Sequence, residues 1–449
     1  MRGATDMIDR PLTGQIRADR RPLTLAEYEA GGGYQALRRA LRQMQPQDVT
    51  QVVKDARLRG RGGAGFSTGG KWAFVPLGPD APRPKYFLVN GDEMEPGTFK
   101  DRLLLESQPH LLIEGTVLGA YAIDAEIAYI FLRGEYRHAA KVLRAALAEA
   151  RAAGYVGERI LGSEYSLDLR LHASAGRYIC GEETALISAL EGKRANPRTK
   201  PPFPPLVGLW GRPSIVQNVE TVCNVPGIVT HGAQWYLGLS RAKDGGTKLY
   251  GVSGKVRHPG LWELPLGTSA AEILNEHAGG MLPGRSLRGF LPGGASTDFL
   301  GPEQLDVAMD FEAVQAAGSR LGTGTMIVLD DATCPVGAVL NLTRFFAQES
   351  CGWCTPCRDG LPWAAATLQA IEEGRGEEGD LAILEHHARL LGPGYTFCAL
   401  APGAVEPLQS ALRLFREEFL RHIREGRCPY RAHAGGETGV TAGAGASQG

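Results

Sequence analysis

Apolar and polar positions in the first half of the chain follow helical and strand-like periods in turn. Apolar residues recur at helical spacing over 35–60, and "KYFLVN" (85–90) is a short β-rich run. Helices are predicted at about 109–122 and 135–153, and strands at "IAYIFLRG" and "LDLRLHA". Alternating strands and helices are typical of an α/β sheet domain with ligand loops at the strand ends.

The pattern changes after the proline-rich connector "NPRTKPPFPPLVGLWGRP" and a helix predicted around 218–240. Residues 241–333 alternate hydrophobic and polar positions around Gly254 and Pro259-Gly260, which predicts a small β-rich domain with one helix. From 334 to 428 the spacing is helical, and the sequence of 429–449 has nothing to bury, so we predict a disordered tail. We therefore expect an N-terminal arm (1–30), an α/β domain (31–240), the β-rich domain and a helical domain.

Three cysteines stand two residues apart in "QESCGWCTPCRDG", at Cys351, Cys354 and Cys357. Thiolates this close repel one another unless a metal centre absorbs their charge. The C-x2-C-x2-C run suits three irons of a 4Fe-4S cluster, whereas structural zinc sites usually take their cysteines in separated pairs. A four-cysteine zinc site and three buried structural thiols remain alternatives.

A fourth ligand has to come from Cys180, Cys223, Cys334, Cys398 or Cys428. Cys398 lies in "LGPGYTFCALAPGA", a loop punctuated by glycine and proline that can fold over a cluster and exclude water. Cys334 opens an apolar helical run and suits packing, and Cys428 lies where the composition turns basic. We therefore choose Cys398.

A glycine-rich loop, "GRGGAGFSTGGKW", follows the first predicted helix. Gly60, Gly62 and Gly65 match G-x-G-x-x-G, but a helix precedes them where a Rossmann fingerprint requires a strand. Arg61 and Lys71 offer cations to phosphates, and Phe66, Trp72 and Phe74 offer flat faces to a nucleotide or flavin ring. The alternative is a flexible loop with ordinary core aromatics.

Acidic residues follow the strand "KYFLVN", at Asp92, Glu93 and Glu95 beside Asn90. Carboxylates accept hydrogen bonds from sugar hydroxyls, so they suit the ribityl or ribose part of a ligand, although solvated turn residues are the commoner case. "YICGEETA" offers the same mixture, because Gly181, Glu182 and Glu183 open a helix whose amides can meet an anion.

Composition limits the possible partners. The 449 residues include 48 basic and 49 acidic residues, which gives no electrostatic footprint of a nucleic-acid binder. The opening stretch lacks the apolar core of a signal peptide, and the most apolar segment, from His110, contains Glu114, Asp124 and Glu126. We therefore expect a soluble, cytoplasmic protein with no direct membrane span and no nucleic-acid partner.

Taken together, "GRGGAGFSTGGKW", "NGDEMEPGTFKDR", "GRYICGEETALISALEGKRANPRTKPPFP", "NVETVCNVP" and "ESCGWCTPCRDGLPW" resemble the NADH-binding flavoprotein, or F subunit, of bacterial NADH:quinone oxidoreductase, respiratory complex I. The resemblance runs over about residues 20–425. It implies a Rossmann-like FMN and NADH domain, a ubiquitin-like β-grasp domain and a helical bundle with one 4Fe-4S cluster. The implied activity is hydride transfer from NADH to FMN, followed by single-electron transfer to the cluster and on toward quinone.

The resemblance also implies roles for single residues. It places NADH at Arg61, Gly62, Gly63, Ala64, Gly65, Phe66, Ser67, Thr68, Gly69, Gly70, Lys71, Phe74, Glu95, Glu183 and Phe203. It places FMN at Gly62, Gly65, Lys71, Asn90, Asp92, Tyr178, Gly181, Glu182, Glu183, Asn218 and Thr221. Glu95 is expected to position the reactants only, the cluster ligands fall on Cys351, Cys354, Cys357 and Cys398, and Gln217 stands where the family pattern has asparagine.

The implied partners belong to the peripheral arm, on the cytoplasmic side of the inner membrane. They are the thioredoxin-like E subunit with its 2Fe-2S cluster and the iron-sulfur G subunit. Two alternatives remain. The diaphorase subunits of NAD-linked hydrogenases and formate dehydrogenases share the same module, and a zinc-stabilised binding module would keep the cysteines without needing the flavin loops.

Overall fold

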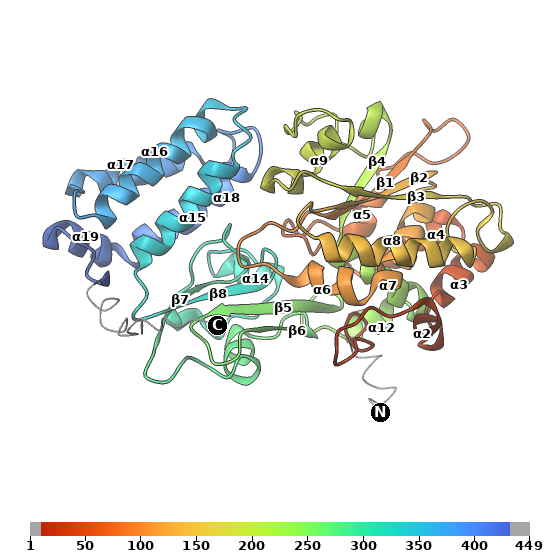
Figure 1. The fold of residues 1–449 in the computed structure, drawn as a ribbon, viewed down its shortest axis with the longest axis horizontal. Coiled ribbons are helices and arrows are strands. Elements are labelled where there is room, and N and C mark those ends of the chain that lie inside the picture. Colours follow the sequence, from red (N-terminus) through yellow and green to blue (C-terminus); the bar gives the residue numbers. More distant parts are fainter. Residues whose placement is uncertain (1–9, 432–449) are drawn as a thin grey trace, which may run out of the picture.

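The computed structural model describes residues 10–431, and its first half is built on a parallel sheet (Figure 1). Four strands take the order β3-β2-β1-β4, and β1 pairs in parallel with both β2 and β4. The strands are β1 (Tyr86–Gly91), β2 (Ile127–Leu132), β3 (Asp168–Ala173) and β4 (Ser214–Asn218). All four carboxyl ends therefore meet at one edge of the sheet, where ligands of open α/β sheets usually bind.

Both faces of this sheet are covered, as the apolar strand sequences require. Phe87 and Val89 of β1 pack into a core with α7 (Pro109–Ala122) and α8 (Arg137–Ala152). Leu88 points to the other face and packs with Leu186 of α9 (Glu183–Leu190). Successive residues of β1 are thus buried in two separate cores. A shift of one residue would exchange the two faces, so the register of β1 is fixed.

The first region differs from the prediction in two places. The predicted helix over 35–60 is two helices, because Pro46 starts a new one. The expected helix around 218–240 is wrong: β4 ends at Asn218, and three short helices follow it. The remaining helices here are α2 (Leu25–Ala30), α3 (Gln35–Gln43), α4 (Pro46–Asp55), α5 (Thr68–Trp72), α6 (Lys100–Ser107), α10 (Val219–Cys223), α11 (Val225–His231) and α12 (Ala233–Gly238), with the one-turn helices η1 (Ile160–Gly162), η2 (Tyr178–Gly181) and η3 (Leu209–Gly211).

The second region holds a mixed four-stranded sheet in the order β6-β5-β8-β7. The central pair β5 and β8 is parallel, and both outer pairs are antiparallel. Its elements are β5 (Thr247–Gly254), β6 (Gly260–Pro265), α13 (Ala270–Glu272), η4 (Ile273–His277), β7 (Leu287–Leu291), η5 (Pro302–Gln304), α14 (Phe311–Ala316) and β8 (Thr325–Asp330). The region has its own core, which includes Tyr250, Phe290 and Met326.

The helices α15 (Pro335–Glu349), α16 (Thr355–Glu372), α17 (Glu378–Leu390), α18 (Leu400–Leu414) and α19 (Arg416–Glu425) form the third region. They gather at one end of the molecule, opposite α2 and α3 (Figure 1). Leu340, Leu361 and Leu408 are buried in their shared core. The cysteine motif spans the short connection between α15 and α16 and the first turn of α16.

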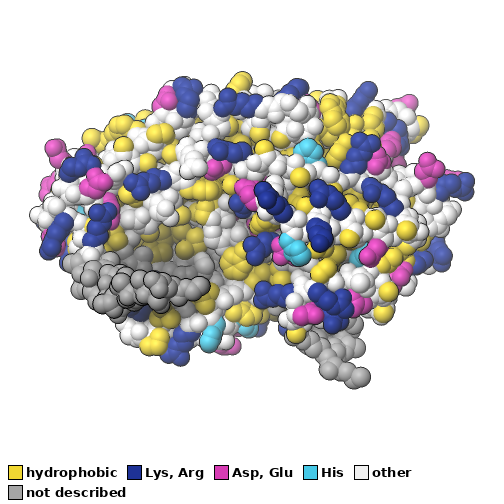
Figure 2. Space-filling view, viewed as in Figure 1, with side chains coloured by type: hydrophobic (Ala, Val, Ile, Leu, Met, Phe, Trp, Pro, Cys, Tyr) yellow, Lys and Arg dark blue, Asp and Glu magenta, His cyan; other side chains and the backbone are white. Residues whose placement is uncertain are grey.

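Basic and acidic side chains are interspersed on the face shown in Figure 2. Among the described residues, no helix has the length and apolarity needed to cross a membrane. Most of the predicted disordered tail, residues 432–449, lies outside the described residues.

Candidate active site

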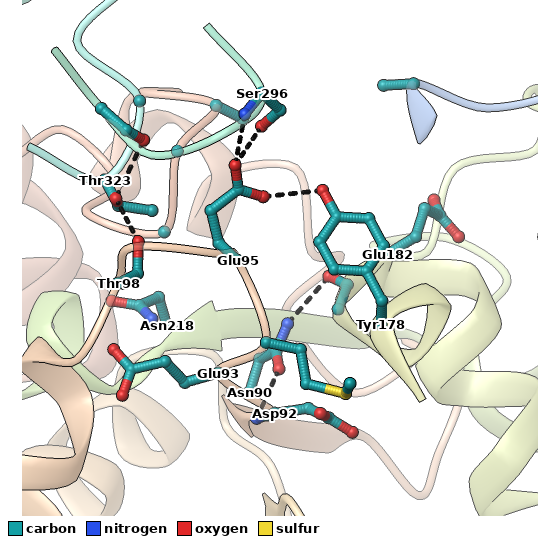
Figure 3. A pocket seen from close by; sticks show the side chains of 18 of the residues that line it. Asn90, Asp92, Glu93, Glu95, Thr98, Tyr178, Glu182, Asn218, Ser296 and Thr323 are labelled. Carbon is teal, nitrogen blue, oxygen red and sulfur yellow. Dashed lines mark hydrogen bonds between the residues drawn. The ribbon is translucent and has the colours of Figure 1, made fainter. Parts of the chain in front are cut away.

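A pocket of about 250 Å³ opens at the carboxyl ends of β1 and β4. Its first wall comes from the glycine loop, the turn after β1 and η2. Its second wall comes from two turns of the mixed-sheet region, which carry Ser296 and Thr323, and from Cys398, Ala399 and Leu400 at the start of α18. All three regions therefore meet at this pocket (Figure 3).

Asn90 and Asp92 occupy the end of β1. The Asn90 side chain donates to the carbonyl oxygen of Gly181 (2.9 Å) and accepts from the amide of Asp92 (3.1 Å). One carboxylate oxygen of Asp92 accepts from Ser174, whereas buried Oδ1 has no hydrogen-bond partner among the described residues. Burial raises the pKa of Asp92 to about 7. A lone buried acceptor in a pocket wall fits a ligand hydroxyl, because unpaired polar groups are costly.

Glu95 lies across the pocket between three segments (Figure 3). Its carboxylate accepts from the amide and the hydroxyl of Ser296 (2.6 and 2.7 Å) and from the hydroxyl of Tyr178 (2.7 Å). Burial raises the pKa of Glu95, although these hydrogen bonds oppose the rise. The side chain is thus held in one orientation by partners from both walls.

Only part of the predicted glycine loop lines the pocket, at Gly62, Gly63 and Ala64. A Cβ on Gly62 would lie 3.0 Å from Asn218 Cβ, so the loop passes close to the end of β4. The expectation that Arg61 faces the ligand is not met in this pocket. Its buried guanidinium donates to the carbonyl oxygens of Gly245 and Thr247, and it therefore joins the loop to the second region.

The rest of the loop supports local structure. Ser67 caps α5, Thr68 is buried, and a Cβ on Gly69 would lie 2.5 Å from the backbone of Lys54. Trp72 is also buried and packs against Phe87, so it offers no free ring. Thr221, expected at the flavin, accepts from the amide of Arg61, and the unusual Gln217 lies buried in β4.

Two cations that line the pocket were missed from the sequence, Lys100 and Arg320. Lys100 donates to Asp101 (2.8 Å) and Asn218 (3.3 Å). Burial lowers its pKa, but Asp101 and Glu220 outweigh burial and leave the pKa above its ordinary value. Lys100 stands inside the motif "NGDEMEPGTFKDR", so the sequence could have predicted it as a site residue. No sequence motif surrounds Arg320.

A cluster of paired charges forms where α9 begins, and we call its members Lys71, Glu182, Glu183 and Lys200 the paired edge. Glu183 accepts from Lys71 (2.6 Å) and from Lys200 (2.7 Å), while Glu182 caps α9 and lines the pocket. Burial would raise the pKa of Glu183, but the two lysines outweigh it and lower the pKa. Lys71 does not line the pocket.

Three aromatic side chains expected at the nucleotide are exposed. Phe66, Phe74 and Phe203 expose 56%, 61% and 53% of their surface. Such exposure is unusual for phenylalanine and leaves their ring faces free to stack.

The four predicted cluster thiols come together beside the end of α15 and the starts of α16 and α18. Cys351 and Cys354 lie between α15 and α16, Cys357 lies in the first turn of α16, and Cys398 precedes α18. Cys398 interacts electrostatically with Cys351 and Cys357, and Cys357 interacts with Cys354. Burial raises the pKa of Cys357 to about 11 and that of Cys398 to about 12. Four sulfur donors packed on an apolar core fit an iron–sulfur cluster.

Two family models match the chain in these places. The Nuo51 FMN-binding domain matches residues 53–227, and the NADH-ubiquinone oxidoreductase-F iron-sulfur binding region matches residues 337–422. The fold and these matches define a class of oxidoreductase subunits that combine a flavin domain with a 4Fe-4S region. The chain belongs to the family of F subunits of NADH-quinone oxidoreductase.

Relatives support this over nearly the whole length. The chain is 56% identical to the NADH-quinone oxidoreductase F subunits of Salmonella typhimurium and of Escherichia coli, covering 92% of this chain and 93% of each relative. Its identity to the Mycobacterium tuberculosis counterpart is 48%, covering 91% of this chain and 92% of that one. A solved NAD+-reducing NiFe-hydrogenase in the H2-reduced state is similar in structure, with a TM-score of 0.78, 35% identity, and coverage of 91% of this chain and 68% of that chain.

Proposed function

We propose that the chain is the electron-input subunit of an NADH-quinone oxidoreductase complex, which oxidises NADH at the pocket and delivers electrons through the four-thiol site toward quinone. One observation carries the proposal: Cys398 belongs both to the pocket wall and to the thiol set. The two sites thus share a wall. When bound, FMN takes up hydride from the nicotinamide and releases single electrons, which a 4Fe-4S cluster accepts.

The FMN would be held by the first wall of the pocket. Asn90, Asp92, Tyr178, Gly181, Glu182 and Asn218 line it. Asp92 Oδ1 would accept from a ribityl hydroxyl, and the backbone of Gly62 and Gly63 together with Lys100 would meet the phosphate. Gly65 and Thr221 do not line the pocket, and the Thr221 hydroxyl accepts from the amide of Arg61 and so holds the glycine loop in place.

NADH would enter from the paired edge. Glu183 is expected to accept from the hydroxyls of the adenosine ribose, and the free faces of Phe66, Phe74 and Phe203 to stack on the adenine. The lysine partners keep Glu183 ionised, so it repels the additional phosphate of NADPH.

Glu95 would position the reacting rings and transfer no proton. Its three hydrogen bonds tie the turn after β1 to η2 and to the turn at Ser296. Hydride transfer requires a short distance and a suitable orientation between the two rings. The hydrogen bonds of Glu95 to both walls of the pocket would help to fix this geometry.

The cluster ligands are Cys351, Cys354, Cys357 and Cys398. The test is Cys357→Ala in the purified protein, because Cys357 does not line the pocket. We expect the cluster signal in paramagnetic resonance to disappear, while FMN stays bound and NADH still bleaches the flavin absorption. Cys223→Ala is the control, since it removes a buried free thiol elsewhere. A full cluster signal in Cys357→Ala, or no bleaching in the wild type, would contradict the proposal.

A second candidate is the diaphorase subunit of an NAD-linked hydrogenase, favoured by the structural likeness at a TM-score of 0.78. The higher identity to the F subunits of NADH-quinone oxidoreductase, 56% against 35%, favours complex I. Isolation of the chain with its native partners distinguishes the two, because only one partner set includes a nickel enzyme.

Three finer points belong to the same proposal. A β-grasp fold for the mixed-sheet region is supported by the order β6-β5-β8-β7 and by the helix after β6. The proposed partners are the E and G subunits of the peripheral arm, and the proposed location is the cytoplasmic side of the inner membrane. Membership of the F-subunit family supports a place in such a complex.

A further inference from the structure

A second group of metal-ligating side chains lies in the helical region, at Cys334, Glu372, His422 and Cys428. One ligand atom from each lies within 4.8 Å of all the others, and Glu372, His422 and Cys428 are buried. These residues are spread over almost a hundred positions and lie outside the pocket. We propose that they bind one Zn²⁺ ion, at a site separate from the four-thiol site.

The ligand chemistry suits zinc. Zinc in proteins takes cysteine sulfur, histidine nitrogen and carboxylate oxygen, usually four in a tetrahedron. Cys334 Sγ lies 3.3 Å from both His422 Nε2 and Glu372 Oε2, and the last two atoms are 3.2 Å apart. Zinc–ligand bonds of about 2.0 to 2.3 Å place tetrahedral neighbours roughly 3.3 to 3.8 Å apart. Small outward shifts of the side chains would therefore admit the ion.

The surroundings orient these ligands. His422 Nδ1 lies 2.6 Å from the carbonyl oxygen of Glu418, so the proton on Nδ1 donates there and Nε2 faces the other three ligands. Metal-binding histidines are commonly held by such a bond. The amide of Gly337, at the start of α15, donates to Cys334 Sγ (3.2 Å), and Arg431 Nε lies 3.7 Å from Glu372 Oε1. Both contacts offset the negative charge that two thiolates and a carboxylate would bring.

The position of the site indicates a structural role. Cys334 caps the start of α15 and Glu372 ends α16, whereas Cys351, Cys354 and Cys357 lie at the other ends of the same two helices. The fifteen residues of α15 separate the two sites by about 22 Å at 1.5 Å per residue. His422 and Cys428 bring in α19 and the segment after it, so zinc would tie the last helix to the pair that carries the cluster (Figure 1). Four protein ligands leave no open position for catalysis.

Metal analysis of the purified holoprotein, after EDTA and gel filtration, tests the proposal. We expect one zinc per chain in the wild type. Cys334→Ser and His422→Gln should each lose the zinc and keep the iron, whereas Cys357→Ala should lose iron and keep zinc. Cys223→Ala, which changes a buried thiol outside both sites, should keep both metals.

Zinc X-ray absorption of the wild type covers the case in which the variants do not fold. We expect two sulfur neighbours at about 2.3 Å and two nitrogen or oxygen neighbours at about 2.0 Å. Four sulfur neighbours would mean that zinc occupies the cluster thiols, and this would overturn the proposal. A zinc-free wild type, zinc retained in both site variants, or an intact mass that shows a Cys334–Cys428 disulfide would overturn it as well.

Discussion

The carboxylates that follow β1 and the carboxylate of Glu183 at the start of α9 lie in opposite electrostatic settings. Within the described residues, Asp92 and Glu95 lack a lysine or arginine hydrogen-bond partner, and burial raises the pKa of both. Glu183 accepts from two lysines, and its pKa is lowered. Burial therefore favours the neutral form of Asp92 and Glu95, which can still accept hydrogen bonds. The two lysines instead favour the ionised form of Glu183.

This difference separates two tasks. A buried carboxylate with an unpaired oxygen is stabilised when a ligand hydroxyl donates a hydrogen bond to it. Asp92 is therefore suited to bind a sugar hydroxyl. A carboxylate whose charge is held by lysines distinguishes ligands by their charge, so Glu183 suits the choice between NADH and NADPH. Substitutions that remove the charge but keep the shape should affect different quantities at the two positions.

The largest effect is expected for Asp92→Asn, on the stability of the FMN-free protein. Folding raises the pKa of Asp92 from about 3.8 to about 7, so the folded state holds a proton that the unfolded state loses between these values. The free energy of unfolding thus falls as pH rises through this window. The variant escapes this cost and should be more stable than the wild type at pH 8 by about 1 to 4 kcal/mol, with the difference vanishing near pH 4.

The same variant should bind FMN more weakly, by about fivefold to tenfold, because a charged acceptor becomes neutral. Urea unfolding at both pH values and FMN titration measure the two effects. Asp298→Asn is the matched control: burial also raises the pKa of Asp298, to about 6, but Asp298 does not line the pocket. Weaker FMN binding in the control as well would remove the assigned role of Asp92.

The next effect is expected for Glu183→Gln, on nucleotide choice. The change leaves Lys71 without its anion and leaves Lys200 with Glu182 alone, so the ammonium groups become more available to the extra phosphate of NADPH. The ratio of kcat/KM for NADPH to that for NADH should rise about tenfold to a hundredfold, the usual worth of one or two charge-assisted hydrogen bonds.

Glu191→Gln is the control on the same helix, because Glu191 also pairs with a lysine, Lys193, but lies at the far end of α9. It should leave the ratio unchanged. If Glu183→Gln lowers stability and leaves the ratio as it was, the residue acts only in the ion pairs and the start of α9.

The carboxylates after β1 and the cluster thiols were predictable from the sequence. Asp92 and Glu95 follow a short apolar strand, and a parallel α/β sheet places such residues at a shared edge. The cluster thiols of 351–357 carry their spacing in seven residues. In each case the functional residues stand close together in the sequence, so the hydrophobic periodicity or the cysteine spacing is enough to place them.

What the sequence did not reveal depends on contacts between distant segments. The partners of Glu95 at Ser296 lie 201 positions away. The sequence suggested that Arg61 binds phosphate, whereas its Nη2 atom donates to carbonyl groups of the second region. Strand β4 was not predicted, because it directly follows the proline-rich connector. Cys334 was assigned to packing because its neighbours His422 and Cys428 approach only when α19 folds against α15.

A smaller effect is expected for Glu95→Gln, on turnover. Glutamine keeps one oxygen for Ser296, but its amide nitrogen cannot accept from Tyr178, so one clamp contact weakens. We expect kcat for NADH oxidation to fall about twofold to tenfold, the worth of one hydrogen bond, with FMN content unchanged. Tyr178→Phe removes the same contact from the other side and should have a similar effect. Additive losses in the double variant would show that the contact itself does not matter.

The smallest effect is expected for Lys200→Met, at the exposed side of the paired edge. Lys200 is more exposed than Lys71, and such pairs contribute about 0.2 to 1 kcal/mol. Its loss leaves Glu183 with one lysine, so the carboxylate is less neutralised and repels NADPH more strongly. The preference for NADH should therefore rise by about twofold to fivefold, opposite in sign to Glu183→Gln. Lys193→Met, which removes an exposed lysine paired with Glu191, should leave the preference unchanged. A shift toward NADPH in Lys200→Met would mean that Lys200 neither neutralises Glu183 nor attracts the phosphate of NADPH, because the loss of either effect favours NADH.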